Sequence, residues 1–126
     1  MLNKARLLVL DVIGGTGFNE IQCESLQDFY DALKCDCFDV AYRRIGDKYF
    51  DIFVDDNGLF VDDPIPSALN GVGKPMLVGN LVFAHHDAEG NTTSLSDDDI
   101  AYIKDHAVGA MTSKRAMWTA IYPVEF

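Results

Sequence analysis

Apolar and polar residues follow regular periods over most of the chain. Leu7–Ile13 is almost continuously apolar and rich in β-forming residues, which predicts a central strand buried on both faces. Gly14–Gly17 supplies glycines that can turn the chain at no steric cost, and Phe18–Cys23 is then expected to return as the second strand of a hairpin. Alternating apolar residues over Phe38–Arg43 and Tyr49–Val54, joined by a short polar turn, predict a second antiparallel hairpin.

Two other segments have the apolar spacing of amphipathic helices. Ser25–Lys34 begins with a serine that can cap the first N–H groups, and its apolar residues recur every three or four positions. Ser96–Val108 begins in the same way, and three aspartates follow the serine, where the helix dipole favours negative charge. The sequence therefore predicts two helices.

The remaining apolar segments are expected to extend the sheet. Met76–Ala84 predicts a core strand in which Gly79 marks a bulge or a close approach of the backbone, whereas Ser67–Gly71 is expected to form one helical turn. Ala116–Phe126 is too apolar for a solvated end and is expected to pack as an extended segment, with a partner-binding surface as the alternative. These elements predict a single α+β domain over residues 1–126, in which a mixed or antiparallel sheet of about five strands is packed against two helices.

The composition of the chain argues against several classes of function. The chain has 126 residues, with 20 acids, 10 bases and a net charge of −10, so direct binding to nucleic acid or to an anionic membrane is not expected. No apolar stretch approaches the ~18 residues of a membrane span, and Leu7–Ile13 is too short for a signal peptide. Three cysteines cannot pair completely, which favours a cytoplasmic protein with reduced thiols.

Several short motifs also occur in a recognisable order: Ser25–Phe29, Asp55–Leu59, Pro64–Asn70, Leu77–Val82 and Thr93–Ile100. In this order, over roughly Arg6 to Lys104, the chain resembles the domain-of-unknown-function family 3846, which is associated with phages and mobile elements. The resemblance implies an α+β domain and an origin near phage or plasmid genes. It implies no activity, because none is attached to the family.

The strongest candidate for catalysis is His85, His86 and Asp87, at the end of a predicted core strand. A histidine beside a carboxylate can act as a general base, so a small hydrolase or a ligand-binding domain is one hypothesis. Adjacent residues of a strand point to opposite faces, however, which makes cooperation between the two imidazoles difficult. A solvent-exposed hairpin end is therefore the favoured interpretation.

Three other motifs are weaker. Cys35 and Cys37 are separated by one residue instead of the two of a zinc knuckle, and with Cys23 they are expected to be unliganded. Gly14–Gly17 lacks the lysine of a phosphate-binding loop, and Asp55–Gly58 lacks the ligand spacing of a calcium loop. We therefore expect no metal and no cofactor.

The distribution of acidic residues also bears on function. From Asp28 to Asp63 the chain has ten acids against four bases, and a shared negative surface would attract a basic protein partner. The leading hypothesis is a non-enzymatic protein-binding or accessory module, with an inhibitor of a host nucleic-acid-binding protein as its sharper form. The alternative is that the acids only keep a small protein soluble. The candidate binding residues are Asp28, Asp31, Asp51, Asp55, Asp56, Asp62 and Asp63.

Overall fold

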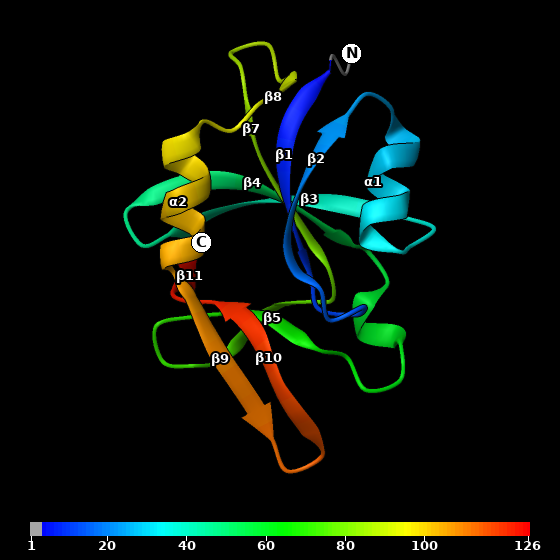
Figure 1. Cartoon of the computed structure of the whole chain (residues 1–126), viewed down its shortest axis with the longest axis vertical. Coiled ribbons are helices and arrows are strands. Elements are labelled where there is room, and N and C mark those ends of the chain that lie inside the picture. The colour runs from blue at the N-terminus through cyan, green and yellow to red at the C-terminus, as the bar shows by residue number, and fades with distance from the viewer. Residues whose placement is uncertain (1–3) are drawn as a thin grey trace.

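The computed structural model describes residues 4–126, which form two β-sheets, two α-helices and one short 3₁₀ helix (Figure 1). The helices are α1 (Leu26–Leu33), η1 (Gly58–Phe60) and α2 (Asp97–Asp105). The strands are β1 (Ala5–Asp11), β2 (Gly17–Cys23), β3 (Phe38–Ile45), β4 (Lys48–Asp55), β5 (Pro66–Leu69), β6 (Pro75–Val78), β7 (Leu81–His86), β8 (Thr92–Thr93), β9 (Ala107–Thr112), β10 (Arg115–Ile121) and β11 (Val124–Glu125).

The larger sheet has seven strands and confirms both predicted hairpins. Its order is β11-β3-β4-β7-β1-β2, with β8 paired to β7, and its strand pairs are antiparallel. β1 lies inside the sheet, where Leu7 and Val9 enter the cluster beneath α1 and Leu8 and Leu10 enter the cluster on the opposite face. Burial on both faces explains why this strand is apolar at nearly every position.

The prediction of one sheet of about five strands is wrong, because the larger sheet has seven strands and a second sheet of four strands is present. The order of this smaller sheet is β6-β5-β10-β9, and β10 pairs with β5 in parallel, so the smaller sheet is mixed. The predicted strand Met76–Ala84 is divided because Gly79 has φ of 80° and bends the chain between β6 and β7, instead of forming a bulge within one strand. Ser67 and Ala68 are fully buried in β5, so the predicted helical turn is also wrong.

Both helices are present, and both are shorter than predicted. α2 ends at Asp105, because Ala107 and Val108 leave the helix and pair with β10 as the start of β9. α1 ends at Leu33, after which Lys34 adopts the left-handed conformation with φ of 55°. Figure 1 shows the two helices on opposite sides of the larger sheet and the β9–β10 hairpin extending away from it.

The C-terminal segment is extended, as predicted, and part of it packs into the core, whereas Met117 and Phe126 are exposed. Ile121 of β10 and Val124 of β11 have no exposed surface, and both belong to the core cluster that joins the larger sheet to α2 and the smaller sheet. Among the helices formed by residues 4–126, none combines the length and the apolar character needed to span a membrane.

Candidate functional site

The predicted strand-end residues lie close in sequence but make separate contacts. His85 Nε2 lies 3.1 Å from the carboxylate of Asp99, and His86 Nδ1 lies 2.7 Å from the carboxylate of Asp51. The carboxylate of Asp87 instead accepts hydrogen bonds from the backbone N–H groups of the turn that follows β7. The structure therefore forms two separate histidine–carboxylate pairs, and His85, His86 and Asp87 do not converge on one point.

The pair on the α2 side joins three elements. Asp99 is 8% exposed, and its carboxylate accepts hydrogen bonds from Lys48 Nζ at 2.8 Å and from the backbone N–H of Ser96 at 3.0 Å, in addition to its contact with His85. Burial alone would raise the pKa of Asp99, but the hydrogen bonds from Lys48, Ser96 and His85 outweigh it and hold that pKa well below its usual value. This carboxylate therefore connects the first turn of α2 to Lys48 of β4 and His85 of β7.

Asp51 is not part of an exposed acidic surface, and that part of the prediction is wrong. It is 7% exposed and faces His86, because its place in β4 is opposite Ala84 of the central strand β7. Beside this pair, the rings of Tyr42 and Tyr49 stack with their centroids 5.0 Å apart.

Asp28 has a local structural role. Its carboxylate accepts hydrogen bonds from the backbone N–H groups of Glu24 at 2.7 Å and Ser25 at 3.1 Å, at the start of α1. These bonds lower the pKa of Asp28. Asp28 therefore stabilises the N-terminus of α1.

The other five candidate acids surround η1. Three hollows, of about 620, 320 and 380 Å³, adjoin this short helix and share the side chain of Asp55 in their walls. Asp63 forms an ion pair with Arg115. The hollows also contain these acids: Asp31, Asp36, Asp39, Asp56 and Asp62.

Between these hollows the chain exposes three consecutive apolar side chains. Leu59 is 75% exposed, Phe60 is 85% exposed and Val61 is 51% exposed. Gly58, which precedes them, is buried, and a Cβ added to it would lie 3.1 Å from Val78 Cγ2. The first residue of the 3₁₀ turn therefore packs against Val78, while the next three side chains face solvent. We define the η1 face as the following residues: Asp31, Asp36, Asp55, Asp56, Leu59, Phe60, Val61 and Asp62.

The three thiols do not form a cluster with other metal ligands. Cys23 lies in the core beneath α1, Cys35 is partly buried and Cys37 is exposed, and all three are free. Within residues 4–126, no three His, Cys, Asp or Glu side chains are arranged to hold a metal ion.

The family model described as a domain of unknown function (DUF3846) matches residues 6–107. The chain belongs to this family. The matched range begins in β1 and ends at the first residue of β9, so it includes the η1 face and both helices, whereas β10 and β11 follow it. No curated protein and no solved structure matches the chain.

Proposed function

We propose that this DUF3846 chain is a non-enzymatic protein-binding module and that the η1 face is its binding surface. The observation that carries the proposal is the run Leu59–Val61, which places three large apolar side chains in solvent beside hollows that could receive partner side chains. Exposing apolar surface costs solvation free energy, and contiguous exposed apolar side chains typically mark interaction sites. A partner would cover these side chains.

The charges on this face favour a basic partner. Within residues 4–126, no ion pair joins the carboxylates of Asp31, Asp55, Asp56 or Asp62 to a base. Of the nearby bases, Lys34 lies 3.7 Å from Asp11 and Arg115 pairs with Asp63. Arg43, which lines one of the hollows, has its guanidinium 4.5 Å from the centre of the Phe126 ring. The unpaired carboxylates would attract a basic surface and orient it before the apolar contacts form.

The sharper form of the proposal concerns the identity of the partner. A nucleic-acid-binding protein of a host cell has a basic surface that binds phosphates. Carboxylates spaced along a surface can bind there in place of the phosphates. The net charge of −10 and the position of the acids around three hollows support this form. Binding of this kind would inhibit the partner by competition with its nucleic acid.

Capture from a lysate of the native host, with quantitative mass spectrometry, tests the apolar contribution. The test variant carries Leu59→Ser and Phe60→Ser. The matched control carries Val72→Ser and Met111→Ser, which are 79% and 69% exposed and line none of the three hollows.

We expect the wild type and the control to capture the same basic proteins, the test variant to lose them, and capture to fall as salt rises. Equal capture by all three chains, or no specific capture by the wild type, would contradict the proposal.

A further inference from the structure

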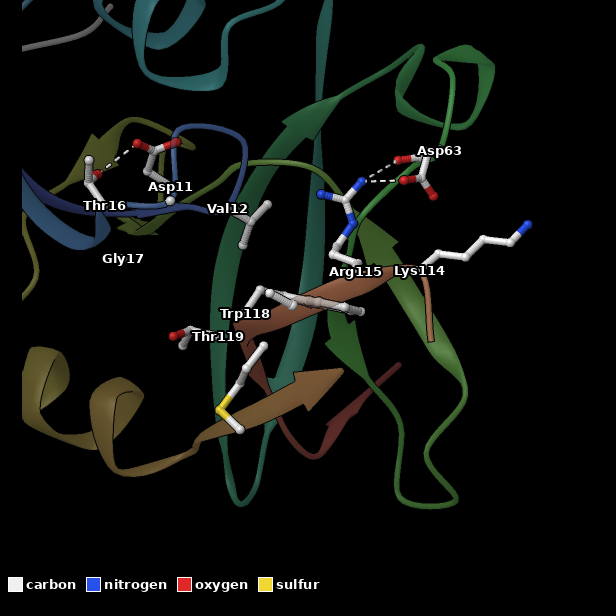
Figure 2. Close-up of a pocket in the computed structure, with 12 residues that line it drawn as sticks. Asp11, Val12, Thr16, Gly17, Asp63, Lys114, Arg115, Trp118 and Thr119 are labelled. Atoms are coloured by element: carbon white, nitrogen blue, oxygen red, sulfur yellow. Dashed lines mark hydrogen bonds and ion pairs between the residues drawn. The ribbon is translucent and has the colours of Figure 1, made fainter. Parts of the chain in front are cut away.

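A fourth hollow lies between the β1–β2 turn and β10, and it shares Asp63 and Arg115 with one of the hollows beside η1. Its volume is about 600 Å³, within the range of small-molecule sites. Figure 2 shows Asp11 and Thr16 on one side, Asp63 and Lys114 on the other, and Trp118 between them. Its β10 wall lies entirely beyond the part of the chain that the family model matches.

An irregularity in β10 determines which of its side chains line this hollow. Arg115 pairs with Thr112 of β9 and Trp118 pairs with Ala110, so β10 spans three steps where β9 spans two. Residues three apart on a regular strand point to opposite faces, whereas one additional residue brings them to the same face. The bulge therefore places both the guanidinium of Arg115 and the ring of Trp118 in one wall.

The Trp118 ring is held in place but is not fully covered. Its Nε1–H donates a hydrogen bond to the carbonyl oxygen of Pro66 at 2.7 Å, and its side chain packs against the core while remaining partly exposed. A fixed aromatic ring at the edge of a hollow offers a surface on which a planar ligand can stack, at little cost in side-chain entropy.

Both acids that line the hollow form ion pairs, Asp11 with Lys34 at 3.7 Å and Asp63 with Arg115. The carboxylate of Asp11 accepts hydrogen bonds from Gly14 N, Thr16 Oγ1 and Asn80 Nδ2, and Asp63 pairs with one terminal nitrogen of Arg115. The other terminal nitrogen of Arg115 is directed toward the Val12 side of the hollow in Figure 2. Lys114 is exposed at the rim and makes no ion pair within residues 4–126.

We infer that this hollow binds a small planar aromatic anion, whose ring stacks on Trp118 and whose phosphate or carboxylate contacts Arg115 and Lys114. Arginine and lysine both hydrogen-bond such anions, and these charge-assisted bonds are stronger than neutral ones. The two acids and two bases that line the hollow balance one another, in a chain with a net charge of −10. None of the residues that define the η1 face lines this hollow.

The chain provides its own reporter, because Trp118 is its one tryptophan. Tryptophan fluorescence is followed during titration with adenosine monophosphate and, separately, with 4-hydroxybenzoate, which distinguish a phosphate from a carboxylate ligand. Adenosine and inorganic phosphate serve as the ring alone and the anion alone, and calorimetry gives a second reading of each affinity.

We expect at least one aromatic anion to change Trp118 fluorescence saturably and to bind about tenfold more tightly than adenosine or inorganic phosphate. Lys114→Gln, at an exposed turn residue, should weaken that anion about fivefold, and adding Arg115→Gln should weaken it further. The control Lys74→Gln, at an exposed lysine outside the hollow, should bind as the wild type does. The chain with Leu59→Ser and Phe60→Ser should also bind normally.

Three results would overturn the inference. These are the absence of saturable binding by both aromatic anions, affinities for adenosine or phosphate equal to that of the aromatic anion, and unchanged affinity after both Lys114→Gln and Arg115→Gln. Because the η1 face is altered in a separate variant, failure here is distinguishable from failure of the proposed protein-binding function.

Discussion

The Lys48 ammonium donates a hydrogen bond of 2.8 Å to the carboxylate of Asp99, and this contact ties the start of β4 to the first turn of α2. Asp99 also receives the backbone N–H of Ser96 and lies 3.1 Å from His85. One buried carboxylate therefore holds a helix N-terminus, a strand and a histidine together. Its role in this structure is to stabilise the fold.

Asp99→Asn should lower the free energy of unfolding by about 2 kcal/mol at pH 7, because charge-assisted hydrogen bonds to a buried group are lost. Urea denaturation monitored by circular dichroism measures the change. Asp98→Asn is the matched control in the same helical turn, since Asp98 is exposed, and it should cost much less.

The effect of Asp99→Asn should depend on pH in a defined direction. The pKa of Asp99 is lowered in the folded chain, so its contribution is fully present above the ordinary carboxyl pKa of about 3.9 and is lost as pH falls below that value. The stability difference between the wild type and Asp99→Asn should therefore shrink from pH 4 toward about pH 2. A difference that stays constant over that range would contradict this assignment.

Asn80 connects three elements through its side chain and should be sensitive to substitution. It is 1% exposed, its Oδ1 accepts the backbone N–H groups of Val12 and Ile13, and its Nδ2 donates to Asp11 and to the carbonyl oxygen of Ala32. Asn80→Ala should lower the free energy of unfolding by about 3 kcal/mol, because buried backbone groups lose their partners.

The control for this substitution is Asn70→Ala. Asn70 Oδ1 accepts two backbone N–H groups in the exposed β5–β6 turn, where water can replace it, so the cost should be about 1 kcal/mol. If urea denaturation gives the same loss in the free energy of unfolding for both variants, burial of the Asn80 hydrogen bonds does not explain the effect of Asn80→Ala.

Gly46 should tolerate no side chain. It has φ of 59°, and an added Cβ would lie 2.6 Å from Tyr102 Oη and 2.7 Å from His106 Nε2. Tyr102 Oη donates to the carbonyl oxygen of Ile45 and accepts the N–H of Asp47, so a displaced ring would lose both bonds. Gly46→Ala should lower the thermal midpoint and cost about 3 kcal/mol.

Gly73→Ala isolates the steric part of that effect. Gly73 also has a positive φ, of 81°, but an added Cβ would meet no atom within 4 Å. Backbone strain alone should then cost about 1 kcal/mol. If the two variants have the same thermal midpoint, the predicted clash with α2 is wrong.

The cysteines should react with alkylating reagents in a fixed order. Burial, with a smaller contribution from Asp28, raises the pKa of Cys23 from 9.0 to about 11, which lowers its thiolate fraction about 100-fold, whereas Cys37 is exposed. Peptide mass spectrometry after iodoacetamide treatment at pH 8 should show Cys37 labelled in the folded chain and Cys23 labelled only after denaturation. Labelling of Cys23 as fast as Cys37 in the folded chain would contradict the buried position.

The periodicity of apolar residues predicts most of the individual helices and strands of this chain, but it does not predict how the strands pair. The alternating segments that became β3 and β4, and the capped segments that became α1 and α2, depend on residues close in sequence. The parallel pairing of β5 with β10 and the bend at Gly79 depend on contacts across the chain. No local pattern specifies them, so the second sheet was not predicted.

The same distinction applies to the candidate site. Asp28 stands three residues after Ser25, which is the spacing of a capping box, so its structural role was visible in the sequence. The burial of Asp51 depends on its pairing with β7, which the sequence does not specify. The run Leu59–Val61 was visible as apolar residues between acids, but only the structure shows that its side chains are exposed.

The central claim is that the acids of the η1 face recognise a basic protein, and reversing their charge tests it most directly. Asp56→Lys with Asp62→Lys is compared with Glu89→Lys and Asp105→Lys, which change the net charge equally at exposed acids outside the three hollows. The measurement is the amount of basic protein that each chain captures from host lysate at low salt. We predict wild-type capture by the Glu89 and Asp105 variant and loss of capture by the Asp56 and Asp62 variant. Equal losses in both variants, or no loss in either, would contradict the claim.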